Sequence, residues 1–126
     1  MGEVDFLLKT YPESSLLFNV KGLAYLDTKP ENAQDYFVRA LTLEPTNVSI
    51  RFNLGVAQQA LGKFKDALLT YKEVVQSKSD YTDAYYNMGN VLKEIREYES
   101  AVNNYDKCLA IDGSYIDAHY NKSIAL

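Results

Sequence analysis

The sequence predicts an all-α protein built from repeated pairs of helices. Many residues recur at an offset of 34 positions, and the apolar residues within each period follow helical spacing. No segment alternates with the period of two that is typical of a β-strand. Because a repeat unit buries its apolar face only against its neighbours, we expect the repeats to form one array.

Five parallel series of residues set this period, and chance does not produce five of them. Each series places the same or a similar side chain at equivalent positions of successive repeats. The series are Ala33/Ala67/Ala101, Phe37/Tyr71/Tyr105, Leu41/Val75/Leu109, Phe52/Tyr86/Tyr120 and Asn53/Asn87/Asn121. Gly55, Gly89 and Ser123 continue the pattern at a position where two backbones approach closely.

Apolar spacing and helix breakers predict two helices in each period. Pro30 suits the first position of a helix, where its missing N–H costs nothing. Asn47 is a candidate N-cap after Pro45, and Gly62 and Gly113 lie in breaks between helices. The expected helices cover residues 15–27, 30–44, 48–61, 64–77, 82–95, 98–111 and 116–126, with a further helix over residues 3–10.

Composition excludes several classes of function. The 13 basic and 17 acidic residues give a net charge of -4, and no block of five like charges occurs, so nucleic acid is not an expected partner. No apolar run approaches the length of a membrane span and the N-terminus lacks the pattern of a signal peptide, so we expect no membrane partner. A single cysteine, Cys108, fits a reducing compartment and a cytoplasmic location.

The residues needed for catalysis and metal binding are scarce. The chain has one histidine, one cysteine and no tryptophan, which leaves no His/Cys zinc cluster and few ways to pair a nucleophile with a base. We expect His119 to be an interface residue and Cys108 to be a packed, inert thiol. The sequence therefore predicts no enzyme activity, no metal site and no cofactor.

The repeats resemble the tetratricopeptide repeat family. The second repeat does so through Asn53-Leu54-Gly55, Gly62, Phe64, Ala67, Tyr71 and Val75, and the third through Tyr85, Asn87-Met88-Gly89, Tyr98, Ala101, Tyr105, Leu109 and Ile111. The resemblance implies a right-handed α-solenoid of antiparallel helix pairs with about three and a half repeats. One departure is that Gly22 and Gly55 lie 33 residues apart, which we interpret as a deletion in the turn before Pro30.

The repeat register divides residues 1–126, taken as a single array, into five parts. Residues 1–14 look like the close of a preceding repeat, and residues 116–126 look like the first helix of a fourth. The complete repeats are expected at residues 15–47, 48–81 and 82–115. The faces left uncovered at the two ends predict end-to-end self-association.

In this family the first helix of each pair lines a concave groove, which the resemblance makes the candidate binding site. An asparagine amide has two donors and an acceptor, so a ladder of amides can bond to the main chain of an extended peptide. Asp83 and Asp117 favour neutral or basic ligands. The groove residues are Phe52, Asn53, Tyr86, Asn87, Asn90, Tyr120, Asn121, Asp83 and Asp117. The alternative is that these asparagines only satisfy local hydrogen bonds.

The segments that begin at Thr82 and Ile116 look like the superhelical repeat region of the O-linked N-acetylglucosamine transferases. In that family an asparagine ladder holds extended substrate, a role that the resemblance assigns to Asn53, Asn87 and Asn121. Asn19 lies 34 residues before Asn53, yet the Gly22 register places Asn19 one position before the ladder site.

Three functions follow as hypotheses. The first is a module that binds an extended protein or peptide segment. The second is the substrate-presenting segment of a larger transferase, and the third is a self-associating scaffold. A clamp for an acidic chaperone tail fits badly, because Asp83 stands where that clamp needs a basic residue.

Overall fold

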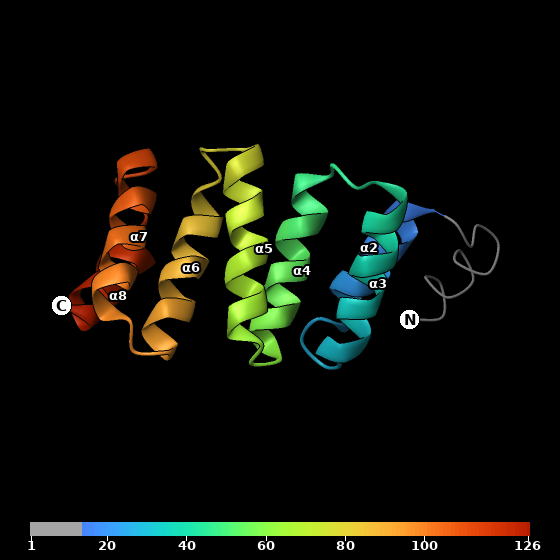
Figure 1. The fold of residues 1–126 in the computed structure, drawn as a ribbon, viewed down its shortest axis with the longest axis horizontal. Coiled ribbons are helices and arrows are strands. Elements are labelled where there is room, and N and C mark those ends of the chain that lie inside the picture. The colour runs from blue at the N-terminus through green and yellow to red at the C-terminus, as the bar shows by residue number, and fades with distance from the viewer. Residues whose placement is uncertain (1–13) are drawn as a thin grey trace. The chain divides into compact units, whose positions relative to one another are not determined.

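The computed structural model of the protein describes residues 14–126, and the expected helix over residues 3–10 lies outside them (Figure 1). Within the described residues all regular structure is helical. The helices are α2 (Ser15–Tyr25), α3 (Pro30–Leu43), α4 (Val48–Ala60), α5 (Phe64–Ser77), α6 (Thr82–Glu94), α7 (Tyr98–Ile111) and α8 (Ile116–Ala125). The predicted all-α helical repeat fold is confirmed, and every predicted boundary lies within two residues of the observed one.

The helix ends follow from local chemistry. Asn47 caps α4 by accepting a hydrogen bond from the N–H of Ile50 at 3.0 Å, as predicted. Gly62 follows α4 with a φ of 75°, in the left-handed region that glycine adopts without strain. Arg96 holds the equivalent place after α6 with a φ of 64°, so the chain accepts a strained backbone there to turn into α7.

The chain divides into two compact units, Met1–Lys63 and Phe64–Leu126. In the first unit α3 packs against both α2 and α4. Its buried core consists of Ala33, Phe37, Ala40, Ile50, Leu54 and Ala57. A Cβ atom on Gly22 would overlap the ring of Phe37, so this glycine lets α2 and α3 approach closely.

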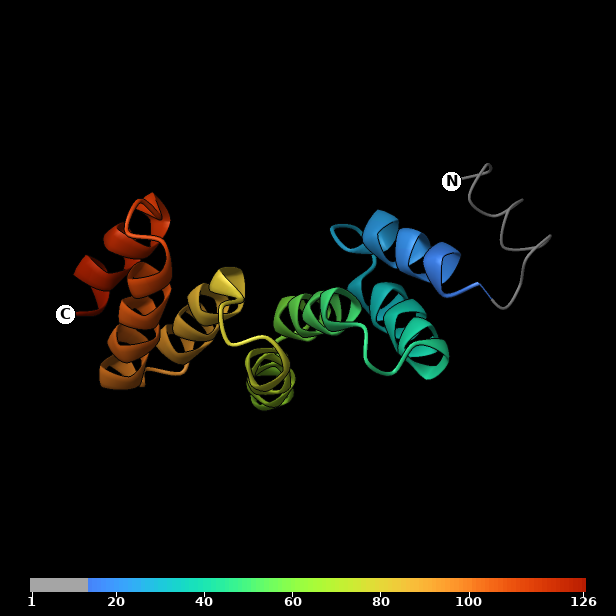
Figure 2. The ribbon, with the colours of Figure 1, turned by 90° about the horizontal axis from the view of Figure 1, so that it is seen from above.

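The second unit packs its four helices in chain order, with α8 also touching α6 (Figure 2). Ala101, Tyr105, Cys108, Ala118 and Ala125 form a buried cluster in this unit. A Cβ atom on Gly89 would lie 2.5 Å from Cε1 of Tyr105, which repeats the close approach seen at Gly22.

The two series predicted to fill the core are buried. Ala33, Ala67, Ala101, Phe37, Tyr71 and Tyr105 have no exposed surface. Each large ring is therefore fully buried, as the repeat pattern predicts.

Candidate functional site

The first helices of the third and fourth repeats, α6 and α8, lie side by side and join through polar side chains. Asn121 on α8 donates a hydrogen bond to the hydroxyl of Tyr86 at 2.8 Å, and its own amide oxygen accepts from Lys93 at 2.8 Å. Tyr115, just before α8, donates to Asp83 at 2.7 Å. These five residues form what we call the α6–α8 seam, which holds the candidate groove residues of the two helices in fixed relative positions.

Aromatic rings pack against one another within the seam and against α7. Tyr86 lies with its ring centroid 4.9 Å from that of Tyr115 and 6.0 Å from that of Tyr105. Tyr105 donates a hydrogen bond to Asn90 at 2.6 Å. Desolvation by burial is the main cause that raises the pKa of Tyr105 and Tyr115 above the usual tyrosine value, and the charge of Asp83 adds to it for Tyr115. Both hydroxyls therefore stay protonated and able to donate at neutral pH.

The three ladder asparagines are each half-buried and each donates one hydrogen bond inside the protein. Asn53 donates to Asn19 at 3.0 Å, Asn87 to the hydroxyl of Tyr71 at 3.2 Å, and Asn121 to Tyr86. The structure thus brings Asn87 and Asn121 into the second unit, while Asn53 and Phe52 belong to the first. Local hydrogen bonding, the alternative role for these amides, accounts for one N–H of each.

Asn19 joins the candidate site residues, although the repeat register had left it out. Its amide oxygen accepts from Asn53, just as the hydroxyl of Tyr86 accepts from Asn121 in the second unit. When the repeats are aligned on Gly22 and Gly89, Asn19 is equivalent to Tyr86. The hydrogen bond from the ladder asparagine therefore recurs, with an amide oxygen as its acceptor in the first unit and a hydroxyl in the second. The 34-residue offset between Asn19 and Asn53 was the sequence signal that pointed to it.

The exposed side chains of this region are the ones available to a partner. Tyr120 is 65% exposed, and Asp83 and Asp117 are exposed acids. In the first unit a hollow of about 320 Å³ opens beside the equivalent face. Its lining includes Leu16 and Asn19 of α2 and Ser49 and Ile50 of α4.

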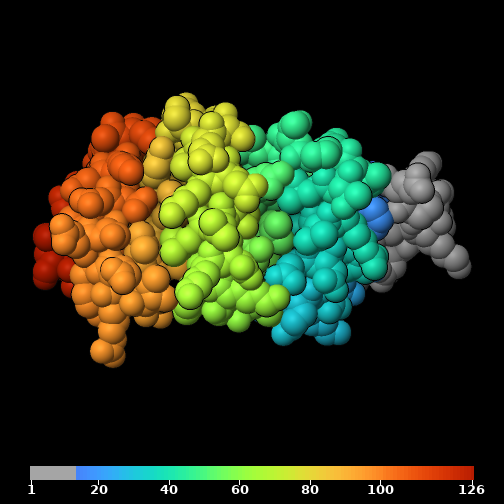
Figure 3. Space-filling model, in the orientation of Figure 1, coloured from blue at the N-terminus to red at the C-terminus, as the bar shows by residue number. Residues whose placement is uncertain are grey.

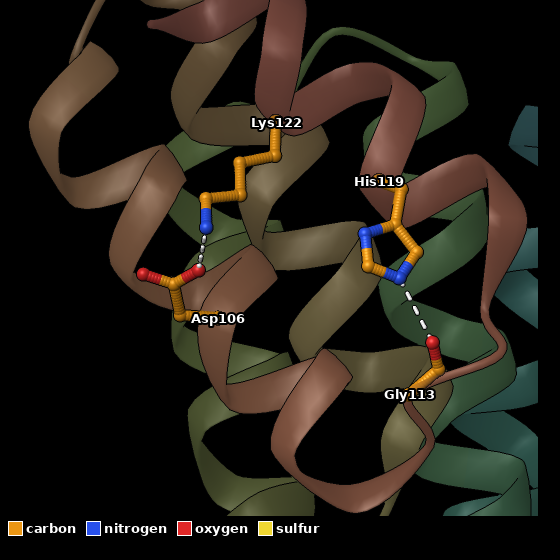
Figure 4. Close-up of polar contacts among 4 residues, drawn as sticks. All are labelled: Asp106, Gly113, His119 and Lys122. Atoms are coloured by element: carbon orange, nitrogen blue, oxygen red, sulfur yellow. Dashed lines mark hydrogen bonds and ion pairs between the residues drawn. The ribbon is translucent and has the colours of Figure 1, made fainter.

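His119 has a structural role that also recurs. Its Nε2 atom lies 2.8 Å from the carbonyl oxygen of Gly113, and because a carbonyl only accepts, Nε2 carries the proton (Figure 4). Tyr85 donates in the same way to the carbonyl of Ser79 at 3.0 Å, and Arg51 to the carbonyl of Pro45 at 2.7 Å. We call these three bonds the turn clamps, because each ties the first helix of a repeat to the turn before it.

The single thiol of the chain lies in the core of the second unit. Cys108 is buried, and burial is the main cause that raises the pKa of its thiol to about 11. Within residues 14–126, no three His, Cys, Asp or Glu side chains gather into a group that could hold a metal ion. None of the described helices is long and apolar enough to cross a membrane.

Two family models match this chain. The tetratricopeptide repeat model matches residues 82–115, and a second model, described as TPR repeat, matches residues 60–95. Among curated proteins, Superkiller complex protein 3 of Homo sapiens is 28% identical over 85 residues, which are 67% of this chain. The match spans only 5% of that protein's length.

Solved structures share the fold. MamA superposes with a TM-score of 0.88 at 24% identity, over 97% of this chain and 72% of that one. YrrB, described as a TPR protein with an unusual peptide-binding site, gives 0.85 at 26% identity, over 88% of this chain and 58% of that one.

A third structure is the first TPR of Spaghetti (RPAP3) bound to the HSP90 peptide SRMEEVD, with a TM-score of 0.84 at 23% identity, covering 89% of this chain and 90% of that one. None of these relatives is described as a transferase. Taken with the repeat pattern, the family-model matches identify residues 60–115 of this chain as tetratricopeptide repeats.

Proposed function

We propose that the chain is a protein-interaction module that binds an extended peptide segment along the first helices of its repeats. The observation that carries this proposal is the α6–α8 seam, where amide, aromatic and acidic side chains of two successive first helices lie beside the 65% exposed Tyr120. An exposed tyrosine offers a partner a large apolar area with a polar tip at a small entropy cost. Peptide binding by YrrB and by the Spaghetti domain supports this class of function.

The amides keep part of their hydrogen-bonding capacity for a ligand. An asparagine side chain has two N–H donors and one acceptor. Asn87 donates one N–H to the hydroxyl of Tyr71. Its second N–H and its oxygen can therefore contact a peptide group. The amide oxygen of Asn121 accepts from Lys93, and one of its N–H groups donates to Tyr86. One N–H of Asn121 is therefore left to donate to a peptide. Asn90 completes the proposed contact residues of the second unit, and Asn53 and Phe52 are the proposed contact residues of the first.

Charge favours a neutral or basic peptide. Asp83 and Asp117 are exposed on the same two helices, and the one lysine in the seam, Lys93, is engaged by Asn121. The peptide SRMEEVD carries three acidic residues and one arginine, so like-charge repulsion would oppose it at this face. A peptide with the acids replaced by lysine should bind more tightly.

The test uses two labelled peptides, SRMEEVD and its charge-reversed form SRMKKVK, titrated with the full chain and followed by fluorescence anisotropy. We expect the lysine peptide to bind more tightly, with a difference that shrinks as salt rises, because the groove acids are exposed. The variant Tyr120→Ala should weaken its binding by about 1 kcal/mol or more, as truncation of an interface tyrosine does.

Two controls separate binding from folding. Tyr98 is an exposed tyrosine on α7, outside the proposed face, so Tyr98→Ala should leave the affinity unchanged. Tyr86→Phe removes the internal acceptor of Asn121 and keeps every groove amide. If Tyr120→Ala and Asn87→Ala both bind the lysine peptide as the wild type does, this face is not the binding site.

Two further roles are compatible with this proposal. As a substrate-presenting segment of a larger transferase, the same groove would hold the substrate chain, and the activity would belong to another domain. As a scaffold, the chain would associate with copies of itself, which the exposed apolar residues of α8 favour. Ile116, Ile124 and Leu126 are 78%, 54% and 81% exposed.

A further inference from the structure

A second hollow lies on a different side of the Phe64–Leu126 unit, where α5, α6 and α7 meet. It encloses about 330 Å³. Leu68 and Val75 of α5 and Met88 and Leu92 of α6 supply its apolar lining. In Figure 3 the surfaces of α5, in yellow-green, and α7, in orange, face the viewer.

The hollow is separate from the α6–α8 seam. Tyr85, Met88 and Leu92 line it from α6, whereas Asp83 and Tyr86 belong to the seam. Residues two positions apart on a helix are rotated by roughly 200°. The two sets therefore occupy different faces of α6, and we expect a partner in the hollow not to compete for the seam.

The charge of the hollow is opposite to that of the seam. Lys72 of α5 and Lys107 of α7 both line it, and its lining contains no acidic residue. Both lysines are exposed, and no described residue is an ion-pair partner of either. In a chain with a net charge of -4, two unpaired cations beside an apolar floor form a local positive site.

We propose that this hollow binds a short acidic peptide segment of a partner protein, anchored by one or two large apolar side chains. A volume of about 330 Å³ lies at the lower end of the range for ligand pockets, which suits side chains better than a large cofactor. Lys72 and Lys107 come from two different helices, so carboxylates on both sides of the anchor can each meet a lysine. Two cations are too few to bind a nucleic-acid backbone tightly.

The experiment titrates the full chain into three fluorescein-labelled, acetylated and amidated probe peptides: EDLFDE, its anchor-free form EDSSDE, and the basic form KNLFNK. We expect EDLFDE to bind most tightly, because only it offers both the anchor and the carboxylates. Its affinity should fall between 50 mM and 500 mM salt, since both lysines are exposed.

Matched variants locate the site. The double variant Lys72→Glu, Lys107→Glu should weaken EDLFDE binding by about fivefold or more, the sum of two modest exposed charge contacts. Lys65→Glu makes one such charge reversal, half of the double variant's change, at an exposed position of α5 that does not line the hollow, and it should have much less than half that effect on a free-energy scale. Ser100→Phe, which fills the hollow from its rim, should also weaken binding.

The proposal is wrong if EDLFDE binds no better than EDSSDE. It is also wrong if the double lysine variant and Lys65→Glu weaken EDLFDE binding equally. Circular dichroism confirms that each variant remains helical. Tyr120→Ala should leave EDLFDE binding intact, which distinguishes this site from the seam.

Discussion

Arg51, Tyr85 and His119 belong to three chemical classes, yet each donates a hydrogen bond to the carbonyl six residues before it. The three lie 34 residues apart, and so do the carbonyls of Pro45, Ser79 and Gly113 that accept the bonds. What the position demands is a long side chain with a donor at its tip. The backbone of the turn fixes the acceptor, so the identity of the donor is free to vary.

The His119 clamp can be tested by exchange between repeats. His119→Ala should lower the free energy of unfolding by about 0.5 to 1 kcal/mol, the net value of one hydrogen bond. His119→Tyr should recover most of that loss, because tyrosine makes the same bond at the equivalent position 85. Urea denaturation followed by circular dichroism measures both. Equal losses in the two variants would show that a tyrosine at position 119 does not replace the histidine bond.

The repeated asparagines were visible in the sequence and the turn clamps were not, and the reason is the same in both cases. Asn53, Asn87 and Asn121 repeat one residue type, so their register is visible without a structure. The clamp donors differ from repeat to repeat and leave no pattern of identity. The partners of the amides were also beyond prediction, because Asn19 and Tyr86 serve as equivalent acceptors with different chemical groups.

At the scale of the helices, the distance between α2 and α3 and that between α6 and α7 each depend on a single glycine. Gly89 on α6 rests directly on the ring of Tyr105 on α7, and Gly22 rests in the same way on Phe37. The ring is fully buried in both cases. A methyl group at either glycine has no room unless the two helices move apart.

Gly89→Ala should destabilise the protein by about 1 to 3 kcal/mol, the usual cost of adding atoms to a packed interface. Gly113→Ala is the matched control. A Cβ atom on Gly113 meets no atom closer than 3.7 Å, so this change should alter stability by less than about 0.5 kcal/mol. Urea denaturation midpoints measure both changes in stability. An unchanged midpoint for Gly89→Ala would mean that the two helices can move apart without loss of stability.

Helix limits were predictable because local residues set them. Pro30, Asn47 and Gly62 act through their own backbone or through residues three positions away. The α2 helix ends at Tyr25, two residues before its predicted end, in the turn that the repeat shortens. The left-handed backbone of Arg96 carried no sequence signal, because arginine is an unusual residue for that conformation.

On the scale of the whole molecule, α8 and the residue that follows it present apolar side chains to solvent. Ile116, Ile124 and Leu126 are each more than half exposed. Burial of such side chains contributes roughly 25 cal/mol per Å² of apolar surface. A second copy of the chain that covers this face would gain that contribution.

We therefore predict concentration-dependent association. Sedimentation velocity over a hundredfold range of concentration should show a rising average mass for the wild type. The double variant Ile116→Glu, Ile124→Glu should remain a monomer, since burying two carboxylates opposes the contact. Leu69→Glu places one such carboxylate at a 62% exposed residue of α5 and should associate as the wild type does. A wild-type monomer at every concentration would contradict the prediction.

The reactivity of the single thiol of the chain can report how often the structure around it opens. Cys108 lies fully buried in the cluster around Tyr105, and its raised pKa of about 11 keeps it in the unreactive protonated form. A thiol reagent added at neutral pH can therefore label it only after that cluster opens. The labelling rate reports how often the Phe64–Leu126 unit opens, without any engineered probe, and a peptide that binds either face of this unit should slow it.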